Sequence, residues 1–215
     1  MVGMIVLVAA EYLADSPLWF RGGSEVGRSD VDDPPALGVS AALRNDLRAW
    51  NDRFEQLSSH VFDDRRDPVV APDPTPPELW DAHRVEAFEL AARVQLELGD
   101  DVHVWCGPGG GMDAVAEWGP VVVVPSGHRG TDVEVLHHGV REVRSARAAG
   151  AREGTAKAIV HWRALTERVG LPFGDAATRA LGLRTAGRVQ ADLGSRAGVG
   201  CWSGWTGPYR YDDHD

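Results

Sequence analysis

The sequence has few cysteines, no long apolar run and no signal-peptide pattern. Cys106 and Cys201 are the only cysteines among 215 residues, which excludes a disulfide framework and favours a reducing compartment. No apolar stretch approaches the roughly 20 residues that a membrane-spanning helix requires. The first residues lack the basic region and the long apolar core of a signal peptide. We therefore expect a cytoplasmic protein that does not enter a membrane.

Several catalytic signatures are also missing. There is no Gly-x-Ser-x-Gly, His-Glu-x-x-His or EF-hand pattern. The stretch Trp105-Cys106-Gly107-Pro108 resembles the start of a thioredoxin active site, but Gly109 stands where the second cysteine is required. The simplest interpretation is a buried cysteine at the end of a strand, followed by a turn. A catalytic role of Cys106 remains an alternative.

The glycines of the segment 104–113 could also converge on a phosphate through their backbone N–H groups. However, the Lys-Ser/Thr pair of a P-loop is missing, a dinucleotide pattern would need a glycine at Met112, and Asp113 adds a negative charge. A nucleotide-binding or hydrolytic enzyme that uses this segment is therefore only an alternative, and no cofactor is predicted. Glu11, which follows the first expected strand, is a second candidate catalytic residue at the carboxyl edge of a sheet.

Charge is distributed unevenly along the chain. Residues 1–125 contain 9 Lys/Arg and 22 Asp/Glu, whereas residues 126–200 contain 12 and 7. The net charge of the whole chain is −10. An acidic part of this size repels phosphate, so only residues 126–200 could contact nucleic acid. The acidic surface could instead meet a basic protein partner.

The first half reads as strand, helix, helix, strand. The apolar run 4–10 predicts a strand covered on both faces, and Ser40 can cap a helix over about 41–57. Thr75-Pro76-Pro77-Glu78 fits a capping box, which predicts a second helix that ends at Gly99. Strands should follow at 102–106 and 121–124. Two amphipathic helices over a small sheet give an α/β fold.

The second half is expected to be mainly helical. Candidate helices cover Thr131–Ala149, Glu153–Val169 and Asp175–Leu193, although Gly182 and Gly187 should weaken the last one by about 1 kcal/mol each. The expected organisation is an α/β domain over 1–125, a helical region over 126–200 and a Gly- and aromatic-rich acidic tail over 201–215.

One cluster has metal-binding residue types. His138 and Glu142 are four residues apart and could share a helix face, with His137, His128 or Asp132 nearby. Gly139 lies between them and no third ligand has motif spacing. We favour a solvated polar face and predict no metal, with His138 and Glu142 as weak candidates.

Residues 140–165 suggest a DNA-binding alternative. The stretch from Glu153 to Lys157 is similar to the start of the recognition helix in the helix-turn-helix of sigma-factor region 4. The resemblance implies a supporting helix over Val140–Ala149 and a turn at Gly150. Its groove or phosphate contacts would be Thr155, Lys157, His161 and Arg163.

A second resemblance covers about residues 4–106. The segments Ala10-Glu11-Tyr12, Pro17-Leu18-Trp19 and 47–54 (Leu-Arg-Ala-Trp-Asn-Asp-Arg-Phe) are similar to those of a group of small uncharacterised proteins from GC-rich bacteria. The resemblance implies no activity. The favoured hypothesis is a non-enzymatic interaction or accessory protein with a protein partner. The alternatives are the DNA-binding regulator and the enzyme of segment 104–113.

Overall fold

The fold contains eight strands and four long helices within the residues that are described. The computed structural model describes residues 4–14, 16–21, 28–30, 37–59, 75–107, 120–123, 132–137, 140–169 and 174–202. Their elements are, in chain order, β1 (Met4–Val8), β2 (Leu18–Arg21), β3 (Arg28–Asp30), α1 (Ala41–Ser58), α2 (Pro77–Leu98), β4 (Val102–Cys106), β5 (Val121–Val123), β6 (Asp132–His137), β7 (Val140–Ser145), α3 (Glu153–Val169), α4 (Ala176–Leu193), the short 3-10 helix η4 (Gly194–Arg196) and β8 (Gly198–Trp202).

All eight strands belong to one mixed sheet. Their order across the sheet is β3-β2-β1-β4-β8-β5-β6-β7. β1 runs parallel to β4, and β5 runs parallel to β8. The two middle strands, β4 and β8, are antiparallel and pair Trp105 with Trp202 and Cys106 with Cys201. The sheet therefore consists of two four-stranded halves that meet at β4 and β8.

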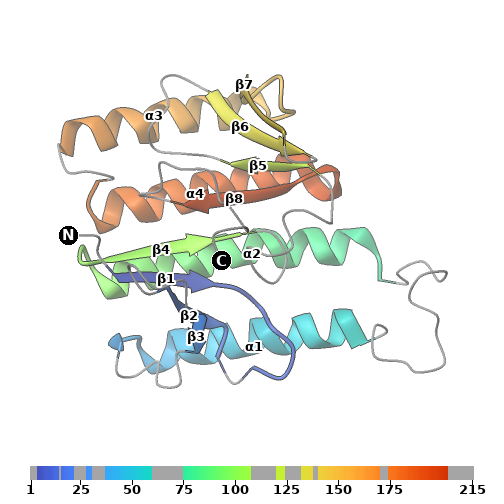
Figure 1. Cartoon of the computed structure of the whole chain (residues 1–215), viewed down its shortest axis with the longest axis vertical. Coiled ribbons are helices and arrows are strands. Elements are labelled where there is room, and N and C mark those ends of the chain that lie inside the picture. Colours follow the sequence, from blue (N-terminus) through green and yellow to red (C-terminus); the bar gives the residue numbers. More distant parts are fainter. Residues whose placement is uncertain are drawn as a thin grey trace, which may run out of the picture.

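The four long helices cover one face of this sheet. Figure 1 shows them side by side in the order α1, α2, α4 and α3, from the bottom of the view to the top. Val6 and Val8 of β1 point into the main core together with the helices. Leu7 and Ala9 belong to a second buried cluster that contains strand and loop residues but no helical ones. β1 is therefore buried on both faces, as its uninterrupted apolar run predicts.

The two halves share one connectivity. In the first half, β1 pairs antiparallel with β2, β2 pairs antiparallel with β3, and two helices lead back to β4 beside β1. In the second half, β5 pairs antiparallel with β6, β6 pairs antiparallel with β7, and two helices lead to β8 beside β5. The outermost strands, β3 and β7, are both rich in charged residues.

The α/β class is confirmed, and the C-terminal part carries the predicted helices α3 and α4. α1 begins after Ser40, whose hydroxyl accepts a hydrogen bond from the backbone N–H of Leu43 at 3.3 Å. Gly99 ends α2 with a φ of 74°. The division into 1–125, 126–200 and 201–215 stays a prediction, and residues 203–215 of the tail lie outside the described residues.

Two local predictions are wrong. The predicted capping box is wrong because Pro76, not Thr75, is the N-cap residue of α2; the hydroxyl of Thr75 donates to the carbonyl oxygen of Leu57 at 2.9 Å. The segment 131–149, predicted as a helix, contains the hairpin of β6 and β7. The alternating sequence Asp-Val-Glu-Val at 132–135 has the period of two that is typical of a strand.

The glycines of α4 do not interrupt it, because they allow close packing. A Cβ at Gly182 would lie 2.5 Å from the ring of Trp162, and a Cβ at Gly187 would lie 3.0 Å from the Cβ of Phe88. These are contacts between α4 and the helices on either side of it. Gly154, at the start of α3, has no atom within 4 Å of the equivalent position.

Replacing Gly182 by alanine should therefore destabilise the fold. Overpacking against Trp162 is expected to lower the free energy of unfolding by about 1–3 kcal/mol. The matched control, Gly154→Ala, should raise it by up to about 1 kcal/mol, because alanine is the better helix former. Urea unfolding of both variants measures the difference. Equal effects at the two sites would contradict this packing.

Candidate functional site

The loop between β1 and β2 places an exposed leucine in a strained conformation. Leu13 has a φ of 60°, and it is the one non-glycine residue with positive φ in the described part of the chain. Its side chain is 79% exposed. A left-handed conformation costs a residue with a Cβ about 1–2 kcal/mol. Such strain persists where the surroundings impose it, and it is concentrated at functional sites.

The base of this loop is closed by two hydrogen bonds. The backbone N–H of Ala9 donates to the carbonyl oxygen of Pro17 at 3.0 Å. The indole Nε1 of Trp19 donates to the carbonyl oxygen of Ala9 at 3.0 Å. Trp19 belongs to the buried cluster on the sheet face away from the helices. The two ends of the loop are thereby fixed to the sheet.

The upper part of the loop is held by α1. The side-chain oxygen of Asn51 accepts from the backbone N–H of Glu11 at 2.9 Å, and its amino group donates to the carbonyl oxygens of Glu11 and Ala14 at 3.1 and 3.2 Å. Oε1 of Glu55 accepts from the backbone N–H of Leu13 at 2.9 Å. Asn51 and Glu55 are four residues apart and so lie on the same side of α1. We call these two residues the loop clamp.

Glu11 thus has a structural part in the site. Its backbone is bound by the loop clamp, and its carboxylate accepts from the backbone N–H of Tyr12 at 3.3 Å. Together with Glu55, it places negative charge beside the exposed Leu13. The outcome is a preorganised loop with an apolar tip and acidic flanks. This arrangement suits binding to another macromolecule.

The helix that carries the loop clamp is fixed to α2 by a buried histidine. The indole Nε1 of Trp50 donates to the carbonyl oxygen of His83 at 3.0 Å, and Nε2 of His83 lies 3.1 Å from the carbonyl oxygen of Trp50. The two rings are stacked with their centroids 4.7 Å apart. Burial lowers the pKa of His83 from 6.5 to about 4, against the opposing effect of its hydrogen bond with Trp50. The imidazole is therefore neutral at pH 7 and donates from Nε2.

Cys106, the other candidate catalytic residue, is fully buried. Burial raises the pKa of its thiol far above the usual value, with a smaller contribution from Cys201, and burial raises the pKa of Cys201 to about 12. Both residues are free thiols. A protonated and inaccessible thiol is a poor nucleophile, which supports the interpretation of Cys106 as a strand-end core residue. Residues 108–113 of the glycine-rich segment lie outside the described residues.

The four residues predicted to contact DNA do not form one surface. Thr155 is buried, and so is Arg163, whose guanidinium donates to the carbonyl oxygen of Asp132. Lys157 and His161 are exposed, and Lys157 lies 3.6 Å from Glu153. The predicted supporting helix over 140–149 is wrong, because residues 140–145 form β7. The helix-turn-helix interpretation therefore fails.

The predicted weak metal candidates are not brought together in the described residues. His138 and His128 lie outside them, and Glu142 of β7 pairs with Arg144. Within the described residues, no group of three or more His, Cys, Asp or Glu side chains could hold a metal ion.

The sequence interpretation missed Leu13 and Asn51. Asn51 follows Leu47 by four residues and so falls within the apolar stripe of α1, where a polar side chain must find buried partners. That position was a usable signal. No signal in the sequence indicated the left-handed conformation of Leu13, because leucine rarely adopts that conformation.

Residues 4–107 match the sequence profile of the Serratia CdiI immunity protein-like family. This segment runs from the first residue of β1 to the residue after β4, so it contains the loop and its clamp. Its extent agrees with the resemblance expected over about residues 4–106. No curated protein and no solved structure matches the chain. Among the described helices, none combines the length and the apolar character that crossing a membrane requires.

The stability of the protein should depend on pH through His83. Because its folded pKa is depressed, the unfolded chain binds a proton at this residue between pH 6.5 and about 4 while the folded chain does not. Stability should fall as the pH drops through this window, by up to about 3 kcal/mol. Above pH 6.5 His83 should contribute no pH dependence.

The matched variant is His83→Gln, which can still donate to Trp50 but does not titrate. Denaturant unfolding at several pH values between 4 and 7.5, with both proteins, isolates the histidine from the carboxylates. The wild type should lose more stability on acidification than the variant. Parallel curves for the two proteins would show that His83 is not buried as described.

Proposed function

We propose that this chain is a non-enzymatic, cytoplasmic immunity-type protein that binds and blocks a toxin protein. The observation that carries the proposal is the match of residues 4–107 to an immunity protein-like family. An immunity protein, in the ordinary sense of the term, protects a cell by binding a toxin. The preorganised loop around Leu13 supports this role, because it lies within the matched segment and presents an exposed apolar side chain.

The chemistry of this segment favours a basic partner. Residues 4–107 contain 9 Lys/Arg and 20 Asp/Glu. Glu11 and Glu55 place carboxylates next to the exposed leucine. A partner that fits would offer a small apolar pocket for Leu13 within a positively charged rim. Complementary charge of this kind increases the association rate and the specificity more than the affinity.

Binding accounts for the described residues better than catalysis does. The candidate nucleophile Cys106 is buried within the core. Glu11 acts through its backbone as part of a loop held by the loop clamp. A rigid loop reduces the entropy lost on association, which is what a tight inhibitor of a toxin needs.

The substitution Leu13→Asn separates binding from folding. Asparagine tolerates the left-handed conformation better than leucine does, so the free energy of unfolding should stay unchanged or rise by up to about 1 kcal/mol. Loss of the apolar tip should weaken partner binding at least about tenfold. Titration calorimetry against a purified candidate toxin domain measures the affinity, and urea unfolding measures the stability.

Leu96→Asn is the matched control, because Leu96 of α2 is also exposed but lies away from the loop. It should bind as the wild type does. Coexpression of the full chain should protect cells from the same toxin domain, and Leu13→Asn should protect them less. Wild-type affinity for Leu13→Asn would exclude the loop as the binding site. Absence of binding by the wild-type chain would exclude the immunity role itself.

A further inference from the structure

We infer that residues 120–202 are a second copy of the unit formed by residues 4–107, and that the two copies pair as the subunits of a two-fold dimer do. On this view, the surface formed by α2 and β4 is a self-association surface, and in this chain the second copy occupies it. The inference is independent of the proposed function. We call residues 4–107 the first unit and residues 120–202 the second unit.

Strand register relates the two units residue by residue. In the first unit, Val6 is paired with Val104 on one side and with Phe20 on the other. In the second unit, Val122 is paired with Val199 on one side and with Val135 on the other. In both units the first of these strand pairs is parallel and the second is antiparallel. Because β4 and β8 run antiparallel beside each other, a two-fold axis between them exchanges the units.

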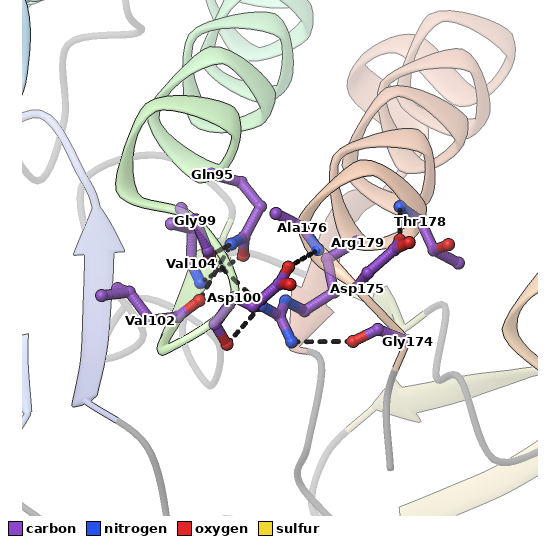
Figure 2. A network of polar contacts seen from close by, with 10 residues as sticks. All are labelled: Gln95, Gly99, Asp100, Val102, Val104, Gly174, Asp175, Ala176, Thr178 and Arg179. Carbon is purple, nitrogen blue, oxygen red and sulfur yellow. Dashed lines mark hydrogen bonds and ion pairs between the residues drawn. The ribbon is translucent and has the colours of Figure 1, made fainter. Parts of the chain in front are cut away.

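A buried glutamine makes the same three hydrogen bonds in both units. Its amino group donates to the carbonyl oxygens of the residues four and seven positions later, and its oxygen accepts from the backbone N–H nine positions later. In the first unit this is Gln95, which binds Gly99, Val102 and Val104 (Figure 2). In the second unit it is Gln190. Each glutamine closes the turn from a central helix into a central strand.

The outer helices are fixed in equivalent ways. The indole Nε1 of Trp50 in α1 donates to the carbonyl oxygen of His83 in α2 at 3.0 Å. The indole Nε1 of Trp162 in α3 donates to the carbonyl oxygen of Thr178 in α4 at 2.9 Å. His83 and Thr178 are 95 positions apart, as are Gln95 and Gln190. The two units therefore share one framework of buried polar contacts.

The entry to each outer helix repeats as well. A carboxylate of Glu97 accepts from the backbone N–H of Ser40 at 2.6 Å, just before α1. A carboxylate of Asp192 accepts from the backbone N–H of Arg152 at 2.7 Å, just before α3. Glu97 and Asp192 are again 95 positions apart.

The sequence keeps a trace of the copying. The pattern Ala-x-Arg-Val-Gln-x-x-Leu-Gly occurs at 91–99 and again at 186–194. At the same separation, Val104 and Cys106 correspond to Val199 and Cys201. Two unrelated units of the same fold class would not be expected to keep one constant separation of buried side chains and hydrogen bonds from α2 through β4 and from α4 through β8. Duplication followed by divergence explains all of these observations together.

The contact between the units has the reciprocity of a two-fold interface. The turn after α2 meets the start of α4, where the carboxylate of Asp100 accepts from the backbone N–H of Ala176 at 2.5 Å. The turn after α4 meets the start of α2, where Asp81 lies 3.0 Å from the Cβ position of Gly194. Asp81 and Ala176 are equivalent positions of the two units, as are Gly99 and Gly194. This reciprocity defines an isologous interface.

One pair of equivalent residues meets its counterpart at the axis. Glu89 and Arg184 are 95 positions apart, and Arg184 donates from Nε and from a terminal nitrogen to the two carboxylate oxygens of Glu89. In an exact two-fold dimer, a residue on the axis faces a copy of itself. Like charges there would repel, whereas two covalently joined copies can diverge to opposite charges.

The buried Arg179 of the second unit also crosses the interface. It donates to the carbonyl oxygens of Gly99 and Asp100 at 3.3 and 2.7 Å, and to that of Gly174 in its own unit at 2.8 Å (Figure 2). The second unit therefore supplies hydrogen-bond donors to the carbonyl oxygens that follow α2, as the partner subunit of a dimer would.

Strand directions predict that the order of the units can be exchanged. β8 runs toward the sheet end where β1 begins, and these two strands are separated only by β4. Trp202 pairs with Trp105, which pairs with Leu7, so β8 finishes level with the fourth residue of β1. Two strand spacings across the sheet and three residues of rise along it put Trp202 and Met4 about 14 Å apart, a distance that the residues outside β1 and β8 can span. The same spacing separates the end of β4 from the start of β5 at the opposite end of the sheet.

A circular permutant tests this prediction. The full chain is opened between Gly110 and Gly111, and Asp215 is joined to Met1, so that the second unit precedes the first. We expect a monomer with the elution volume of the natural chain and a single cooperative unfolding transition at an unchanged denaturant midpoint. The control permutant is opened inside the first unit, between Asp67 and Pro68, and should unfold at a lower midpoint. A boundary permutant less stable than this control would overturn the inference.

Cleavage of the natural chain gives a second measurement that does not depend on the permutants folding. A protease site is inserted between Gly110 and Gly111, and the folded protein is cut there. The two pieces should elute together in a 1:1 ratio, and their unfolding midpoint should fall on tenfold dilution, as for a dimer. Pieces that separate or precipitate would show that the units do not form a self-sufficient pair.

Discussion

The antiparallel contact between β4 and β8 is the constraint on which the rest of the fold depends. Each strand is the inner edge of a four-stranded half, and each is apolar. A half on its own would expose an unpaired apolar edge, which is the feature that natural sheets avoid. When β4 and β8 pair with each other, with α2 and α4 packed against them, neither half is left with an unpaired apolar edge. The continuous core follows from this one contact.

The candidate interaction loop illustrates how a helix can organise a segment with no regular structure of its own. Asn51 supplies one acceptor and two donors to the backbone, so the loop needs no water to satisfy those groups. The stacked Trp50 and His83 hold the helix in place. The core thus fixes the position of α1, and α1 in turn fixes the loop around Leu13. This is the pattern of a binding surface that is built before its partner arrives.

Most of the helices could be predicted because their sequence signals are local. Ser40 caps α1, Gly99 ends α2, and apolar residues recur at helical spacing. The hairpin of β6 and β7 was missed because the alanine- and arginine-rich residues that follow it favour a helix, and this outweighed a short alternating pattern. The shared pattern at 91–99 and 186–194 was available in the sequence. It would have predicted strands, not a helix, before α3.

The conformation of Leu13 and the partners of Arg163 could not be predicted, since both depend on contacts between segments far apart in the chain. Arg163 occupies in α3 the place that Asn51 occupies in α1, and it also binds a backbone carbonyl, that of Asp132 at the start of β6. A charged side chain can therefore replace an amide at an equivalent buried position when a carbonyl is close enough to receive it. Arg163 was predicted to be a DNA-contacting surface residue because it is positively charged.

The outer strands have a consequence for behaviour at high concentration. An open sheet can in principle grow by adding strands from neighbouring molecules, until a filament forms. Here β3 has only three residues, Arg28, Ser29 and Asp30, while three of the six residues of β7 are arginine or glutamate. A strand that paired with either edge strand would have to desolvate charged groups. Growth is thus unfavourable at both ends, and the fused pair can remain a discrete particle.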